Sequence, residues 1–133
     1  RGTRILLAED DPISRTLGIS LLEKHGCTVT AVENGNEVVA AFARQTYDLV
    51  LLDIQMPEMD GFAAATALRE RERHTGGRVP IIAMTAHALP EDREKCLAAD
   101  MDDHISKPVD IDHLLALVRK YRRSNLTQKR PAA

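Results

Sequence analysis

Four short apolar runs of this sequence are each followed directly by charged or hydroxyl-bearing side chains. The residues concerned are Glu9, Asp10, Asp11, Asp53, Thr85 and Lys107. A lone carboxylate at the end of a buried strand is costly, so it requires a compensating partner. If these side chains meet, they bring several carboxylates, one hydroxyl and one ammonium group to a single place.

Repulsion between the carboxylates indicates what such a cluster would bind. Two carboxylates such as those of Asp10 and Asp53, if about 4 Å apart, repel by about 4 kcal/mol at an effective dielectric constant of ~20. Protonation, the amine of Lys107 or a divalent cation can relieve this repulsion, but one lysine cannot neutralise three carboxylates. Oxygen ligands with no histidine or cysteine among them favour Mg²⁺, which keeps several of its waters. The cluster therefore predicts a magnesium site.

The elements that must position these residues follow from alternating short apolar and longer amphipathic runs. Strands are expected at residues 4–8, 27–32, 48–52, 79–84 and 104–106, and helices at 12–25, around 38–42, at 62–73, from 90 onward and at 111–121. This alternation predicts an α/β, flavodoxin-like (βα)5 three-layer fold with a parallel five-stranded sheet in the order 2-1-3-4-5. Continuous apolar runs are typical of strands buried on both faces. The carboxyl ends of such strands share one edge of the sheet, where folds of this class bind ligands.

Each residue of the cluster also has a plainer interpretation when it is taken alone. The acids from Glu9 to Asp11 suit the N-terminus of the helix expected after them, and Asp11 is expected to act only as a cap. Thr85 alone is typical of a capping or solvated hydroxyl, and Lys107 alone of a surface lysine. Asp53 ends a different, central strand, so the expected meeting at one edge favours a binding site.

Composition and charge exclude several other classes of protein. The chain has 133 residues, 44% hydrophobic and 29% charged, which suits one ordinary domain, and no apolar stretch approaches a membrane span. Residues 1–118 hold 20 acidic and 12 basic residues, a net charge of −8, which argues against duplex nucleic acid as the main ligand. Cys27 and Cys96 do not make a disulfide framework and are expected to be reduced, packed thiols.

The segments ILLAEDDPIS, LVLLDIQMPEMDGF, PIIAMTAHA and DMDDHISKPV occur in this order between residue 4 and about residue 121. Together they resemble the receiver domains of two-component response regulators, most of all those of hybrid sensor histidine kinases. The resemblance implies a phosphoacceptor domain of phosphorelay signalling. Such a domain catalyses its own phosphorylation and slow dephosphorylation and is not an enzyme in the usual sense. The start at Arg1 and the resemblance favour a domain taken from a hybrid histidine kinase.

The resemblance implies a role for each member of the acidic cluster. Asp53 matches the phosphoacceptor, a carboxylate nucleophile, which is a recognised kind of covalent acceptor. Asp10, Asp53 and the backbone carbonyl of Gln55 match the protein ligands of Mg²⁺, for which Mn²⁺ can substitute. Glu9 stands at the position that binds the ion through water.

The resemblance also places residues that respond to the phosphoryl group. Thr85 matches the hydroxyl that reaches a phosphoryl oxygen, and Lys107 the cation that pairs with it, with Pro108 at the usual place of a cis peptide. His104 stands at the position of the switch aromatic, although a solvated histidine at a strand end is the plainer alternative.

Further positions match parts of the family that move or that set phosphate lifetime. Ala86 begins a segment, up to residue 99, with a thin apolar face, which we expect to move. His87 and Gln55 occupy positions that tune the lifetime of the phosphoryl group. Asp100 stands where related sequences often have glycine.

The implied partners are a histidine kinase core or a histidine phosphotransfer domain, with homodimerisation through the last two helices and the last strand as a further expectation. No direct nucleic acid and no membrane contact are expected, and the location is expected to be cytoplasmic, including the cytoplasmic part of a membrane-bound sensor kinase. Partners are expected to dock on the helix after Asp11. There the residues expected to face the core are Ile13, Leu17 and Leu21, and those expected to face a partner, or solvent, are Ser14, Arg15 and Gly18.

Residues 1–123 are expected to form the receiver domain and residues 124–133 a frayed tail or linker. Two other functions on a similar fold remain open at this point. A phosphatase with an aspartate nucleophile would also use Asp53 and Mg²⁺, but it usually has a second acid two residues later, where this chain has Gln55. A flavin or nucleotide binder would need a glycine-rich phosphate loop after the first strand, where three acids stand instead.

Overall fold

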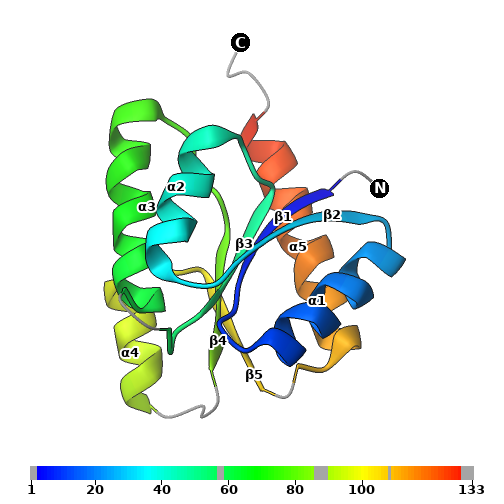
Figure 1. Ribbon diagram of the computed structural model, residues 1–133. Coiled ribbons are helices and arrows are strands. Elements are labelled where there is room, and N and C mark those ends of the chain that lie inside the picture. The colour runs from blue at the N-terminus through cyan, green and yellow to red at the C-terminus, as the bar shows by residue number, and fades with distance from the viewer. Residues whose placement is uncertain (1–2, 57–58, 86–89, 108, 130–133) are drawn as a thin grey trace.

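The structure, a computed structural model, describes residues 3–56, 59–85, 90–107 and 109–129, and a parallel five-stranded sheet lies at its centre (Figure 1). The strands are β1 (Thr3–Ala8), β2 (Cys27–Val32), β3 (Leu49–Asp53), β4 (Ile81–Thr85) and β5 (Asp103–Ser106). Their order across the sheet is β2-β1-β3-β4-β5, and every neighbouring pair is parallel. The predicted flavodoxin-like topology is therefore confirmed.

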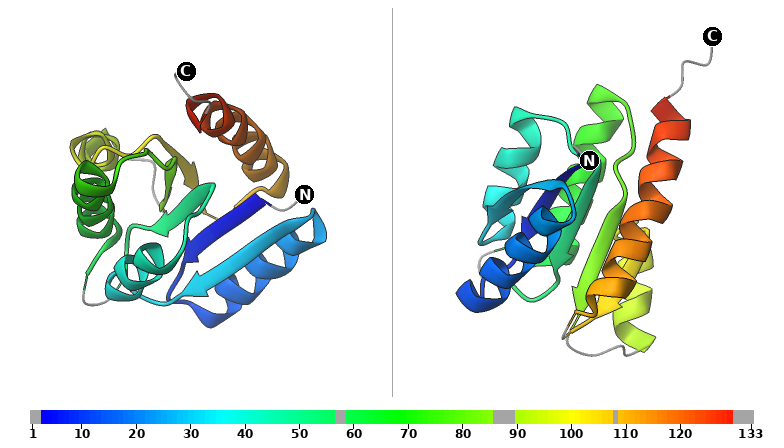
Figure 2. Two further views of the ribbon diagram at one scale, coloured as in Figure 1. Left: turned by 90° about the horizontal axis from the view of Figure 1, so that it is seen from above. Right: turned by 90° about the vertical axis from the view of Figure 1, so that its right-hand side faces the viewer.

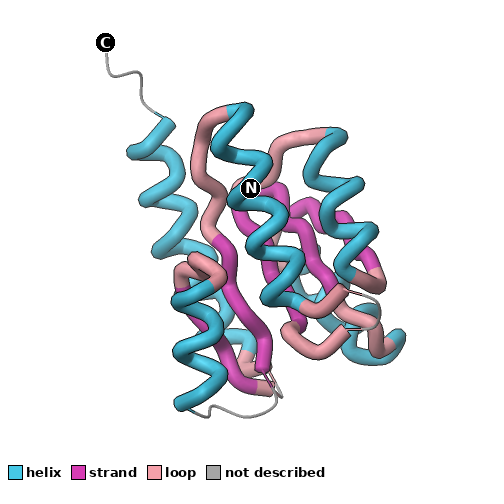
Figure 3. The backbone as a smooth tube through the Cα atoms, turned by 90° about the vertical axis from the view of Figure 1, so that its left-hand side faces the viewer, coloured by secondary structure: helices cyan, strands magenta, loops and turns pink. Residues whose placement is uncertain are grey.

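Five helices alternate with the strands and cover both faces of the sheet. They are α1 (Pro12–Lys24), α2 (Gly35–Arg44), α3 (Gly61–Thr75), α4 (Pro90–Ala98) and α5 (Ile111–Lys129). Helices α2, α3 and α4 pack against one face and α1 and α5 against the other, as the view from above in Figure 2 and the tube in Figure 3 show. Neighbouring residues of β1, β3 and β4 point alternately into the two cores, which explains why these strands read as continuous apolar runs.

Helix α5 ends later than the sequence indicated. It continues to Lys129, so residues 124–129, expected to be part of a frayed tail, are helical. The domain boundary after residue 123 stays a prediction.

Neither Cys27 nor Cys96 forms a disulfide, as expected. Within the described ranges, no helix combines the length and the hydropathy that crossing a bilayer requires.

Local caps and one close backbone contact set where helices begin near the edge of the sheet that carries Glu9, Asp10 and Asp53, called the acidic edge from here on. The side chain of Asp11 accepts a hydrogen bond from the amide of Ser14 at 2.8 Å, so its predicted capping role is confirmed. Asp60 caps α3 in the same way, and Gly61 follows it. A Cβ at Gly61 would lie 2.7 Å from the backbone oxygen of Asp53, too close for any side chain. Gly61 therefore lets α3 begin directly against the end of β3.

Helix α1 presents a different face to the core from the one that its four-residue spacing predicted. Ile13 and Leu17 are 78% and 57% exposed, so the prediction that they face the core is wrong. Leu22 is buried in the core and Ile19 packs against it, and at Gly18 an added Cβ would lie only 3.1 Å from a side-chain methyl of Leu7. Because glycine lets α1 approach β1 closely at this point, the apolar residues at positions 13 and 17 are turned outward.

The other residues that were assigned to the two faces of α1 differ in outcome. Leu21, expected to face the core, is only partly buried, whereas Ser14 is exposed, as expected. Arg15, expected to face a partner or solvent, is turned towards the end of β1, where its side chain is 20% exposed. The exposed face of α1 thus carries the apolar side chains of Ile13 and Leu17.

A buried arginine, Arg69, connects three segments at the end of the molecule opposite the acidic edge. The guanidinium of Arg69 donates to the carboxylates of Glu72 (2.8 Å) and Asp102 (2.7 Å) and to the carbonyls of Val79 and Asp100. These bonds connect α3, the start of β4 and the turn before β5. Every buried side-chain polar atom of the described residues has a hydrogen-bond partner, which is what keeps a buried ion pair tolerable.

Asp100 has a left-handed backbone with φ of 61°, a conformation that glycine adopts most readily. It is the residue that ends α4 in a Schellman motif: its amide donates to Leu97, and that of Met101 donates to Cys96. Its carboxylate accepts from Arg78 at 3.1 and 3.2 Å. The hydrogen bond from Arg78 lowers the pKa of Asp100. Aspartate is accommodated at this position because it tolerates the left-handed backbone and forms an ion pair with Arg78.

The Asp100→Asn variant tests this ion pair, because asparagine also tolerates the left-handed backbone. Since the pKa of Asp100 is lowered in the folded state, its contribution to stability is present above the ordinary aspartate value of 3.8 and is lost as the pH falls below it. We expect the variant to lose about 0.5 kcal/mol of unfolding free energy at pH 7 and the difference to shrink below pH 4. Urea unfolding at both pH values measures this. A constant difference, or an equal loss in the exposed control Glu23→Gln, would contradict it.

Candidate functional site

The carboxyl end of β1 brings two of the predicted acids to the edge of the sheet in different environments. Glu9 is 2% exposed and Asp10 is exposed. The amide of Glu9 donates to Val32 at the end of β2, and one of its carboxylate oxygens accepts from the amide of Asp11. Glu9 is thus fixed inside the edge, whereas Asp10 faces outward from it.

Asp53 ends β3 at the centre of the same edge and is held on both carboxylate oxygens. Its Oδ1 accepts from the amide of Gln55 at 2.9 Å, and its Oδ2 lies 2.7 Å from Nζ of Lys107. Only 4% of Asp53 is exposed. Asp53 is therefore a buried carboxylate with a fixed orientation, which answers how a charge is tolerated at the end of a fully buried strand.

Lys107 follows β5 and forms ion pairs with two acids at the ends of two other strands. Its Nζ lies 2.7 Å from Asp53 and 2.9 Å from Oε1 of Glu9. Its backbone amide donates to the carbonyl of Thr85 at 2.8 Å, which keeps the end of β5 beside the end of β4. Thr85 itself is 3% exposed at the end of β4. All four strand ends predicted from the sequence therefore meet.

The local charges shift the pKa values of two of these groups. Burial raises the pKa of Glu9, an effect that neighbouring Asp53 strengthens and Lys107 opposes. Burial alone would lower the pKa of Lys107, but its hydrogen bonds to Asp53 and Glu9 outweigh burial and raise it. The lysine thus stays charged, and the edge still contains more negative than positive charge.

The three acids fit a divalent cation. One carboxylate oxygen each from Glu9, Asp10 and Asp53 lies within 4.8 Å of the other two, and they are the one such group of histidine, cysteine or acidic residues in the described ranges. The donors are all oxygen, and the one cation that pairs with them, Lys107, contacts Glu9 and Asp53 but has no ion pair with Asp10. This chemistry suits Mg²⁺.

Some predicted residues lie elsewhere or outside the described ranges. His104 is half-buried on β5, level with Ala83 of β4. The predicted residues Ala86, His87 and Pro108 lie outside the described residues. The contacts of Arg15 and Arg69 were not predicted from the sequence, because most of them are made to backbone carbonyls or to acids distant in the sequence, which leave no spacing pattern.

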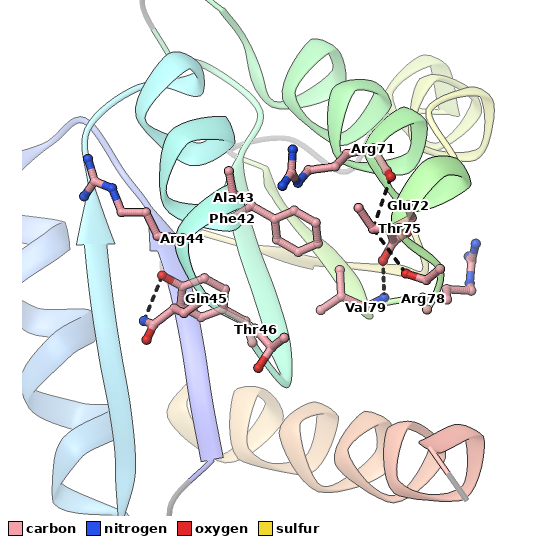
Figure 4. A pocket seen from close by; sticks show the side chains of 13 residues that line it. Phe42, Ala43, Arg44, Gln45, Thr46, Arg71, Glu72, Thr75, Arg78 and Val79 are labelled. Carbon is pink, nitrogen blue, oxygen red and sulfur yellow. Dashed lines mark hydrogen bonds between the residues drawn. The ribbon is translucent and has the colours of Figure 1, made fainter. Parts of the chain in front are cut away.

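A pocket of about 480 Å³ lies at the other end of the sheet and contains none of the predicted site residues (Figure 4). It opens between the C-terminal ends of α2 and α3, with Phe42 and Val79 among its apolar lining. Arg71 extends above the ring of Phe42 from α3, and Gln45 donates to the hydroxyl of Tyr47 on the opposite side. Glu72 is the one acid in the lining of this pocket, and its carboxylate accepts from Arg69 and from the amide of Val79, so the pocket has no cluster of acids like that of the acidic edge.

Comparison with known proteins gives one family. Residues 5–119 match the family model described as the response regulator receiver domain. The chain is 40% identical, over 134 residues, to the sensor protein GacS of Pseudomonas syringae pv. syringae, covering 99% of this chain and 14% of that protein. It is 38% identical, over 142 residues, to histidine kinase 1 of Arabidopsis thaliana, covering 82% of this chain and 12% of that protein. The chain thus spans only a small part of these two relatives.

The fold is also similar to a solved receiver structure. The receiver domain of a sensor histidine kinase from Pseudomonas aeruginosa superposes with a TM-score of 0.84 and 39% identity, covering 92% of this chain and 99% of that chain. That crystal structure has a magnesium ion coordinated in its active-site cleft.

Removing the cation of Lys107 tests whether the acidic edge binds a metal. In Lys107→Met the three carboxylates face no lysine, so we expect a lower melting temperature in EDTA and roughly tenfold tighter Mg²⁺ binding than in the wild type. Melting curves across a Mg²⁺ titration measure both effects. The control Lys24→Met, at the exposed end of α1, should match the wild type. Equal stabilisation of all three proteins by Mg²⁺ would disprove the site.

Proposed function

Because the chain belongs to the family of response regulator receiver domains, we propose that its Asp53 accepts a phosphoryl group from a phosphohistidine of a partner protein. The observation that supports this most directly is the geometry of Asp53. It is a buried carboxylate at the centre of the edge, oriented by Lys107 and by the amide of Gln55. A nucleophile held in this way needs little reorganisation before it reacts.

The proposed reaction moves one phosphoryl group. A lone pair on a carboxylate oxygen of Asp53 forms the new oxygen–phosphorus bond, while the phosphorus–nitrogen bond breaks and its electrons stay with the imidazole, which takes up a proton. Positioning and charge neutralisation are the main requirements of such a transfer. Mg²⁺, held by Asp10, Asp53 and the carbonyl of Gln55 with Glu9 acting through water, would neutralise charge on the phosphoryl oxygens. Lys107 pairs with one of those oxygens.

We further propose that phosphorylation shifts an existing conformational equilibrium. The hydroxyl of Thr85, on the neighbouring strand, would hydrogen-bond to a phosphoryl oxygen. Helix α4 follows shortly after β4, and its exposed residues include Leu97, 70% exposed, so it has little apolar contact with the sheet to lose. His104 on β5 would change its packing with it. In a hybrid histidine kinase this domain would act on the cytoplasmic side of the membrane.

The Asp53→Asn variant tests the phosphoacceptor. We expect the wild type to gain one phosphoryl group when it is incubated with acetyl phosphate and Mg²⁺, and to gain none in EDTA. Asp53→Asn should gain none, because an amide is a poor nucleophile. Intact mass spectrometry measures the adduct, and Asp112→Asn, an exposed aspartate on α5, is the matched control. An adduct that persists in Asp53→Asn would overturn the assignment.

The outward face of α1 supports a partner surface beside the phosphoacceptor. Ile13 and Leu17 lie one helical turn apart, both are largely exposed, and α1 begins directly after the acidic edge. An apolar pair next to the site suits the helical surface of a histidine kinase core or a histidine phosphotransfer domain, which has to bring its phosphohistidine to Asp53. Apolar anchors of this kind usually contribute most to binding energy.

Replacing the exposed apolar residues tests this surface. We expect Ile13→Asn and Leu17→Asn each to slow transfer from phosphorylated histidine phosphotransfer domains roughly tenfold, because each removes an apolar anchor. Phosphorylation by acetyl phosphate, which needs no docking, should keep its rate. Leu97→Asn, an equally exposed leucine on α4, is the matched control. Equal slowing with acetyl phosphate, or in the Leu97 variant, would reject the surface.

A further inference from the structure

We infer that Arg15 is a positioning residue for the metal-binding acids: its guanidinium holds the backbone of Glu9 and Asp10 so that their carboxylates converge with that of Asp53. The inference rests on the proposed function of this edge. Arg15 lies in the first turn of α1, and its Nη1 donates to the carbonyl of Glu9 at 3.0 Å and to that of Asp10 at 3.4 Å.

Three segments meet at this guanidinium. Arg15 belongs to α1, the two carbonyls belong to the turn after β1, and Nη2 lies 3.8 Å from the carboxylate of Glu33, which follows β2. The amide of Arg15 also donates to the carbonyl of Asp11 at 2.9 Å, so the backbone of α1 is fixed to the same turn. The turn after β1 is therefore held both by the side chain of Arg15 and by the backbone of α1.

The contacts identify geometry, rather than charge, as the contribution of Arg15. Its hydrogen bonds at this edge go to carbonyls, whereas the carboxylates of Glu9 and Asp53 are paired with Lys107. A planar guanidinium can satisfy two carbonyls and still direct a second nitrogen at Glu33, whereas a lysine ammonium is a single point charge. Replacing Arg15 by lysine keeps the charge but loses the planar arrangement of N–H donors.

The two explanations, charge and positioning, predict opposite changes in Mg²⁺ affinity when Arg15 is replaced. If Arg15 acted only through its charge, removing a cation close to the acids would tighten Mg²⁺ binding, because like charges repel. If Arg15 positions the turn, removing it lets the carboxylates of Glu9 and Asp10 diverge, and binding weakens. A hard cation that demands near-ideal geometry, as Mg²⁺ does, is sensitive to such a change.

The test is a calorimetric titration of Mg²⁺ into the full chain for the wild type, Arg15→Met and Arg15→Lys. We expect the dissociation constant to rise roughly tenfold in both variants, with lysine giving no rescue. Arg44→Met, an exposed arginine on α2, is the control and should bind as the wild type does. An unchanged or tighter constant in Arg15→Met, or full rescue by lysine, would overturn the inference.

Phosphorylation is measured separately, so that the two proposals can fail independently. With acetyl phosphate, the Mg²⁺ concentration for half-maximal rate should rise in step with the dissociation constant, while the rate at saturating Mg²⁺ should change much less. If Asp53 takes up no phosphate in any variant and Mg²⁺ binding still weakens, the phosphoacceptor fails and the positioning role stands. If Arg15→Met loses its folded circular dichroism, the lysine variant alone decides the outcome.

Discussion

The ion pairs of Lys107 with Asp53 and Glu9 set the conditions for the whole acidic edge. Lys107, at the end of β5, pairs with the carboxylates of Glu9 after β1 and Asp53 at the end of β3. Asp10, which has no ion pair with Lys107, adds further negative charge. The edge is therefore held together by an interaction that leaves a net negative charge, which a divalent cation would balance.

At the opposite end of the sheet the charges are more nearly balanced. Arg69 is buried with carboxylate and carbonyl partners for its donors, and Arg78 pairs with Asp100 and Asp102 outside it. This end connects α3, the start of β4 and the turn before β5, and its three carboxylates, those of Glu72, Asp100 and Asp102, face two guanidiniums. At the acidic edge three carboxylates face one lysine, so the larger charge imbalance lies there.

The fold and most of the candidate site could be predicted from the sequence because they depend on local signals. Apolar runs predicted the strands, and the residues that follow them predicted Asp53, Thr85 and Lys107. The face of α1 was predicted wrongly, because the period of its apolar residues does not tell which face lies inward when Gly18 permits a closer approach. The contacts of Arg15 and Arg69 could not be predicted, since most of their partners are backbone carbonyls or acids distant in the sequence, which come close only once the chain has folded.

The Schellman motif at the end of α4 has a mechanical consequence. Helix α4 is fixed at its C-terminal end through Asp100 and the arginines that hold this residue, and Asp102 continues the same connection to β4. Its N-terminal end, at Pro90, lies towards the acidic edge, and no comparable ionic attachment is found there among the described residues. If α4 moves relative to the sheet, the displacement is therefore smallest at its C-terminal end, Ala98, beside Arg69 and Arg78. It is largest at its N-terminal end, Pro90, beside the acidic edge.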